Sequence, residues 1–115
     1  MSNESKATGS NGENIAADYL IKNGYKILKR NFKAKTGEID IIAYKNGVTV
    51  FIEVKNRKTL SFGYGFDAVN AKKRQKIINT AGIYCSLNGG DRQCRFDVIS
   101  IDEGHVKHIE NAFML

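Results

Sequence analysis

The 115-residue sequence lacks the features that mark an exported or membrane-bound protein. It has no run of about 18 consecutive apolar residues, so we expect no transmembrane helix. Residues 1–12 are polar and lack the apolar segment of a secretory signal peptide. The only cysteines, Cys85 and Cys94, have no metal-ligand spacing, and without an export signal we expect reduced thiols. These absences indicate a cytoplasmic protein.

The composition that remains is typical of one folded domain. Hydrophobic residues make up 42% of the chain and charged residues 26%, which are ordinary values for a globular protein. The length suits a single domain with a modest core, and no repeat or change of composition divides it. We therefore expect a flexible N-terminal tail over residues 1–12 and one domain over residues 13–115.

The net charge of +6 is concentrated in two segments. Residues 22–35 contain basic residues and no acid, and in residues 55–76 the basic residues far outnumber a single acid. A solvated surface is one interpretation, but a basic rim also suits a polyanion, and we favour nucleic acid. The basic residues that we expect to contact it are Arg30, Arg57, Lys58, Lys72, Lys73 and Lys76.

Residues 37–58 hold the most informative pattern of the chain. Two runs rich in β-branched residues flank Asn46-Gly47, which is a strong signal of a β-hairpin. If these two residues form the turn, the register places Asp40 opposite Glu53. A three-residue loop would instead put the two acids on opposite faces of the hairpin.

Asp40 and Glu53 are carboxylates in strands whose other residues are suited to burial. In the expected register their Cβ atoms lie roughly 5 Å apart, and two charges at that distance repel by about 3 kcal/mol at an effective dielectric of about 20. Mg²⁺ between them would remove the repulsion. Lys55 shares the face of Glu53. As alternatives, each acid could form a structural ion pair, and Lys55 could pair with Glu38.

Hydrophobic periodicity predicts the remaining elements. We expect helices over residues 13–23 and 67–88, and further strands over residues 25–32, 94–101 and 106–113. The long helix should begin at the N-cap Asp67, and its buried stripe should contain Ile77, Ile78, Ala81, Tyr84 and Cys85. A strand, a helix and a return strand form a right-handed crossover, so the strands before and after the long helix should be parallel. The fold class is α/β, a mixed sheet of about five strands with flanking helices in the order α-β-β-β-α-β-β.

An Asp, a hairpin and Glu-x-Lys on the next strand resemble the PD-(D/E)xK signature of restriction-endonuclease-like nucleases. Ile39 stands where that signature has proline, a position that carries no chemistry. More closely, the chain resembles the YraN-like family of small bacterial proteins, which are similar to archaeal Holliday-junction resolvases. The matching segments are residues 12–20, 24–31, 37–43, 50–57, 95–99 and 108–113.

The resemblance implies a metal-dependent endonuclease that hydrolyses phosphodiester bonds in structured or branched DNA. Asp40, Glu53 and the Val54 carbonyl would bind Mg²⁺ or Mn²⁺, and Glu13 would complete the metal site. Lys55 would orient or deprotonate the attacking water and stabilise the charge on the phosphate. Resolution of a junction needs two active sites, so that substrate would require a homodimer.

Other interpretations stay open from the sequence. The same fold could be a catalytically silent nucleic-acid-binding module or, less in keeping with its charge, a protein-interaction adaptor. Glu13 could be an acid favoured by the helix dipole. The aromatic residues of the segment 62–66 could stack on bases, although we favour anchoring of a loop. His105 and His108 are better interpreted as strand-edge residues than as metal ligands.

Overall fold

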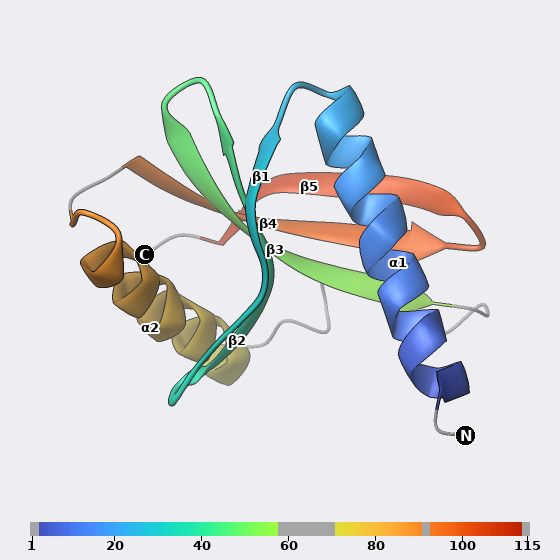
Figure 1. Cartoon of the computed structure of the whole chain (residues 1–115), viewed down its shortest axis with the longest axis horizontal. Coiled ribbons are helices and arrows are strands. Elements are labelled where there is room, and N and C mark those ends of the chain that lie inside the picture. The colour runs from blue at the N-terminus through green and yellow to red at the C-terminus, as the bar shows by residue number, and fades with distance from the viewer. Residues whose placement is uncertain (1–2, 58–70, 91–92, 114–115) are drawn as a thin grey trace.

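The computed structural model describes residues 3–57, 71–90 and 93–113, with side chains from residue 11 to residue 56 in the first range (Figure 1). Its elements follow in the order α-β-β-β-α-β-β, as predicted. They are α1 (Asn3–Lys22), β1 (Lys26–Ala34), β2 (Gly37–Lys45), β3 (Val48–Arg57), α2 (Ala71–Leu87), β4 (Gln93–Asp102) and β5 (His105–Phe113). Within these residues neither helix combines the length and apolar content that a membrane crossing requires.

The strands of the described residues form one five-stranded mixed sheet in the order β1-β2-β3-β4-β5. β3 and β4 are parallel and the other neighbours are antiparallel. The predicted parallel pairing around the long helix is therefore confirmed. β5 lies at an edge of the sheet, with β4 as its neighbour.

The β2–β3 hairpin has the predicted two-residue turn. Asn46 and Gly47 have φ values of 52° and 83°, and positive φ at both positions is what a type I′ turn requires. The register counted from this turn is confirmed as far as Ile41 opposite Ile52. Over these paired residues, successive side chains of each strand point to opposite faces of the sheet.

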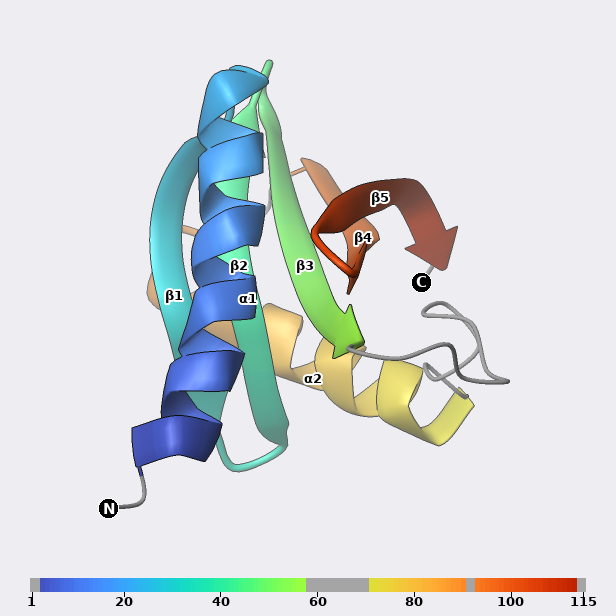
Figure 2. The ribbon, with the colours of Figure 1, turned by 90° about the vertical axis from the view of Figure 1, so that its right-hand side faces the viewer.

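Each helix covers one face of the sheet (Figure 2). The two faces bury separate apolar clusters, so the central strands are covered on both sides. The cluster under α1 contains Ala16, Ala17, Leu20, Tyr25, Ile41, Ala43, Val50, Ile52, Ile99 and Ile101. The cluster under α2 contains Ile39, Ile42, Phe51, Ile77, Ala81, Tyr84, Phe96, Val98 and Phe113.

The predicted start of the first helix at residue 13 is wrong, because α1 begins at Asn3. Residues 3–12 have no periodic apolar face, so the sequence gives no helix signal for this segment. In the structure Gly12 is buried, and a Cβ at that position would lie 2.8 Å from Nδ2 of Asn56 on β3. At Gly12 a close approach to the sheet, rather than an apolar stripe, accompanies the helix.

The long helix differs from the prediction in its buried stripe. Ile77, Ala81 and Tyr84 are buried as expected, Ile78 and Cys85 are only partly buried, and Thr80 is buried as well. Its hydroxyl donates to the Lys76 carbonyl at 2.8 Å, which satisfies a polar group inside the core. The predicted N-cap Asp67 and the aromatic segment 62–66 lie outside the described residues.

Candidate active site

The two predicted acids lie where β2 separates from β3. The described β2–β3 pairing extends no further than Ile41 opposite Ile52, whereas β2 continues to pair with β1 as far as Gly37. Beyond that point the Asp40 carboxylate replaces a strand partner, because its Oδ2 accepts the N–H of Val54 at 2.8 Å. Where the strands diverge, the Asp40 carboxylate thus bonds the backbone of β3 in place of a β2 backbone group.

α2 forms the opposite wall of the site. The β1–β2 turn contacts α2 through the hydroxyls of Thr36 and Thr80, which are 2.6 Å apart. This contact holds the far end of β2 beside α2, and a pocket of about 510 Å³ lies between β2, β3 and the helix. The pocket is lined by Gly37, Glu38, Asp40, Glu53, Lys72, Lys73 and Lys76.

Glu53 is bonded to lysines from two elements. Its Oε2 lies 2.7 Å from Nζ of Lys73 on α2 and 3.3 Å from Nζ of Lys55 on β3. The Glu53 side chain is only 10% exposed, so these ammonium groups compensate a charge that is largely removed from water. The alternative of an ion pair at Glu53 is therefore present, and Lys55 pairs with Glu53 rather than with Glu38.

Asp40 is the acid that is most perturbed by its surroundings. Burial, and after it the charge of Glu53, raises the pKa of Asp40 to about 7, while the hydrogen bond from Val54 opposes the shift. Burial also lowers the pKa of Lys55, as does the neighbouring Lys73, against the attraction of Glu53. A cation placed beside Asp40 and Glu53 would stabilise both carboxylates in their charged forms.

The donor set fits a hard divalent cation. Mg²⁺ is usually bound by one or two carboxylates and completes its shell with waters and substrate phosphates. Asp40 and Glu53 supply the carboxylates. The N–H and C=O of one strand residue point to the same side, so the Val54 carbonyl points to the side on which its N–H meets Asp40.

Glu13 lies close to the site but has other partners. Its Oε1 accepts from Asn31 at 3.1 Å and pairs with Arg30 at 3.5 Å. Its charge still contributes to the raised pKa of Asp40. In the described parts of the chain no three His, Cys, Asp or Glu side chains are close enough together to hold a metal ion. The acids that line the pocket are Glu38, Asp40 and Glu53, and of these Asp40 and Glu53 are the two that the sequence predicts as metal ligands.

The basic residues predicted to contact nucleic acid fall into three groups. Lys72, Lys73 and Lys76 line the pocket on α2. Arg30 on β1 pairs with Glu13 on α1. The side chain of Arg57 and the whole of Lys58 lie outside the described parts. One wall of the pocket is thus cationic, next to the two acids.

A buried polar network under α1 was not predicted from the sequence. Asp97 has a fully buried side chain and accepts from Nε and Nη2 of Arg95 at 2.9 and 2.8 Å, from Nε2 of His108 at 2.6 Å and from the Asn111 N–H at 2.9 Å. Burial alone would raise the pKa of Asp97, but these hydrogen bonds outweigh it and hold the pKa below its ordinary value. His108 is therefore on the edge strand, as predicted, but it is buried in a network.

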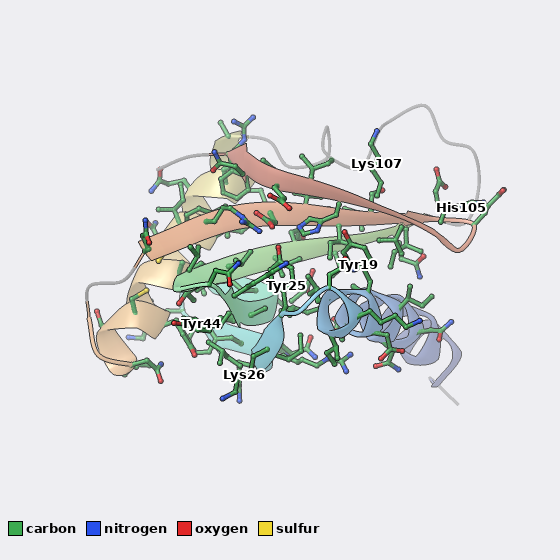
Figure 3. The ribbon with its side chains drawn as sticks, turned by 90° about the horizontal axis from the view of Figure 1, so that it is seen from above. Tyr19, Tyr25, Lys26, Tyr44, His105 and Lys107 are labelled. Carbon is green, nitrogen blue, oxygen red and sulfur yellow. The ribbon has the colours of Figure 1, made fainter. Side chains whose placement is uncertain are left out.

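Two tyrosines complete this network, Tyr19 on α1 and Tyr25 directly before β1 (Figure 3). Nδ1 of His108 lies 3.0 Å from the Tyr19 hydroxyl, and Arg95 donates to the Tyr25 hydroxyl at 2.7 Å. The contacts tie α1, β4 and β5 together on the face opposite the pocket. The signal in the sequence was Arg95-x-Asp97, which places opposite charges on one face of an otherwise apolar strand.

Comparison with known proteins gives a consistent match over the whole domain. The model of an uncharacterised protein family, UPF0102, matches residues 12–101. A UPF0102 protein of Caldanaerobacter subterraneus is 50% identical over an alignment 117 residues long, and the alignment covers 94% of this chain and 95% of the relative. One from Clostridioides difficile is 44% identical over 116 residues, covering 98% and 100%. One from Persephonella marina is 44% identical over 110 residues, covering 93% of each chain.

Proposed function

The chain belongs to the uncharacterised protein family UPF0102, the YraN-like family that its motifs resemble, and we propose that it is a metal-dependent endonuclease. Its substrate would be structured or branched DNA, and its fold would be the restriction-endonuclease-like one. One observation carries the proposal. Asp40 and Glu53 line a single pocket at the divergence of β2 and β3, with Lys55 on Glu53 and lysines on the facing helix.

Each residue has a role that its position supports. Asp40, Glu53 and the Val54 carbonyl would hold Mg²⁺ or Mn²⁺. When bound, such an ion polarises a phosphate and lowers the pKa of the attacking water. Lys55 lies beside Glu53 in a largely buried position, where its ammonium would stabilise the negative charge that develops on the phosphate. Lys72 and Lys76 would hold the neighbouring backbone phosphates.

Cleavage assays test the proposal directly. The protein is incubated with branched, nicked, single-stranded and duplex DNA in Mg²⁺, Mn²⁺ or EDTA. We expect metal-dependent cleavage of a branched or nicked substrate, and a loss of at least about 100-fold in rate for Asp40→Asn, because the substitution removes a charge from the metal site. Asp18→Asn on the exposed face of α1 is the matched control and should retain the wild-type rate.

A catalytically silent nucleic-acid-binding module is the second candidate. The observation that favours it is the pairing of Glu53 with two lysines, which already compensates its charge without a metal. Salt-sensitive DNA binding with no cleavage of any substrate in either metal would support the module and contradict the nuclease.

A further inference from the structure

Lys73 and Lys55 contact the same oxygen of Glu53 from different elements. The Lys73 contact is the shorter, at 2.7 Å against 3.3 Å to Oε2. Lys73 does not belong to the acid-hairpin-lysine pattern of the sequence. It reaches Glu53 because α2 forms a wall of the pocket. The site therefore holds a second ammonium that the nuclease pattern does not require.

The two lysines differ in how easily they can leave Glu53. Lys55 is on the same strand as Glu53, two residues further on, and its side chain is 20% exposed. Lys73 is on the opposite wall of the pocket, and its side chain is 39% exposed. A lysine has a flexible four-carbon stem and no fixed hydrogen-bonding geometry. Lys73 can therefore change its partner without a movement of the sheet.

The formal charges show why an exchange would matter. When all four groups are ionised, the two negative charges of Asp40 and Glu53 are balanced by the two positive charges of Lys55 and Lys73. A divalent cation that binds Glu53 would compete with the Lys73 ammonium for Oε2 of Glu53. The two cations would also repel each other. A nucleic-acid phosphate in the same pocket would offer Lys73 another anionic partner, next to Lys72 and Lys76.

We propose that Lys73 is an exchangeable counter-ion of this site. It pairs with Glu53 in the structure and transfers to a backbone phosphate when nucleic acid enters, which leaves Glu53 to the divalent cation. The inference rests on the proposed function, from which it takes the cation and the nucleic acid. Its consequence is coupling. Nucleic acid strengthens metal binding, and by linkage the metal strengthens nucleic-acid binding by the same factor.

Mn²⁺ titration of the full chain tests the exchange, with free Mn²⁺ measured by electron paramagnetic resonance. Without nucleic acid, Lys73→Met should bind Mn²⁺ on the order of tenfold more tightly than wild type, because a cation is removed from the Glu53 oxygen. Lys72→Met is the matched control. It removes the same charge from the same pocket wall and should change the affinity less than about twofold, since more distant charges are screened.

A second arm measures the coupling. A short DNA duplex, corrected for the Mn²⁺ that the duplex binds alone, should strengthen Mn²⁺ binding by wild type and by Lys26→Met, an exposed lysine outside the pocket lining, but much less by Lys73→Met. Lys73→Arg keeps the charge and should behave as wild type. Thermal unfolding of each variant verifies that it is folded.

The outcomes separate this inference from the nuclease proposal, because Mn²⁺ binding needs no hydrolysis. Equal affinity changes in Lys72→Met and Lys73→Met, or weaker Mn²⁺ binding by Lys73→Met, would overturn the exchange even if the wild type cleaves DNA. Tighter Mn²⁺ binding by Lys73→Met, in a protein that cleaves none of the DNA substrates, would support the exchange and contradict the nuclease proposal. Absence of Mn²⁺ binding in both proteins would contradict both proposals.

Discussion

At the scale of single residues, Asp40 and Glu53 line one pocket but have different neighbours. Glu53 is in contact with two ammonium groups. Asp40 accepts a backbone N–H from Val54 and lies within the fields of three other acids, one of which is Glu53. One hydrogen bond from a neutral donor does not compensate for burial and like charges. The surroundings of Asp40 therefore disfavour its charge, whereas the charge of Glu53 is compensated.

This gives a pH-dependent prediction for Asp40→Asn. Burial and Glu53 raise the pKa of Asp40 from 3.8 to about 7, so the folded state binds this proton more tightly than the unfolded state. Between about pH 4 and pH 7, a rise in pH therefore lowers the free energy of unfolding. The amide that replaces the carboxylate would be uncharged at every pH, and its carbonyl can still accept from Val54.

We expect the melting temperature of Asp40→Asn to exceed that of wild type by about 5 °C at pH 8 and by clearly less at pH 5. Thermal unfolding in metal-free buffer at the two pH values measures this difference. Asp18→Asn, an exposed position on α1, should show no such dependence. A gain that is the same at both pH values would mean that Asp40 does not titrate as described.

At the scale of elements, the packing of α1 on β3 depends on one small residue. Gly12 is buried, and a Cβ there would lie 2.9 Å from the Cβ of Asn56, an atom that cannot move without its strand. Asn56 directly follows Lys55. The contact that determines how closely α1 approaches β3 is therefore one residue away from the site lysine. α2 is different, because Gly82 is exposed and, among the described residues, no atom outside its own stretch of helix lies within 4 Å of its Cβ position.

The two glycines form a matched pair of substitutions. Gly12→Ala should lower the free energy of unfolding by about 2 kcal/mol, because the overpacking outweighs the better helix propensity of alanine. Gly82→Ala should raise it by about 0.5–1 kcal/mol, since alanine fits an exposed helix better than glycine. Urea denaturation measures both. Stabilisation by both substitutions would show that α1 does not approach β3 this closely.

At the scale of the whole molecule, positive charge is distributed unevenly about the fold. The net charge is +6, and three lysines on one helix line the pocket that holds the two acids. The network around Asp97 lies on the other face of the sheet, under α1, where Arg95 and His108 surround one carboxylate. The pocket face therefore offers cations to a polyanion, whereas the charges of this network are paired within the protein.

Salt dependence of DNA binding tests this distribution. The affinity should fall as salt rises, and the slope of log K against log salt should decrease by about 0.9 for each phosphate that a variant no longer neutralises. Lys72→Ala with Lys76→Ala should therefore reduce the slope by about 1.8. Lys26 is exposed at the start of β1 (Figure 3), at the end of the strand away from the pocket. Lys26→Ala should therefore leave the slope unchanged. Equal slopes for wild type and both variants would place the DNA elsewhere.

The order of the elements was predictable from the sequence, and so was the hairpin register from the turn to Ile41 opposite Ile52; the predicted pairing of Asp40 with Glu53 is not among the described strand pairs. Asn46-Gly47 specifies a two-residue turn through its positive φ values, and a two-residue turn determines which residues face each other. The crossover around the long helix required parallel strands. These features depend on local backbone chemistry and apolar periodicity, and both can be read along the chain.

The partners of the charged groups, in contrast, depend on tertiary packing. Nothing in the residue order indicates that β2 pairs with β3 only from Ile41 onward, that α2 brings Lys73 to Glu53, or that Asp97 meets His108 under α1. Each of these contacts joins segments that are remote in sequence or depends on where a strand diverges. The order of residues therefore determined which acids and lysines are available, and the packing of helices on the sheet determined which of them meet. Electrostatic interactions depend on distance and burial, and neither is a property of residue order.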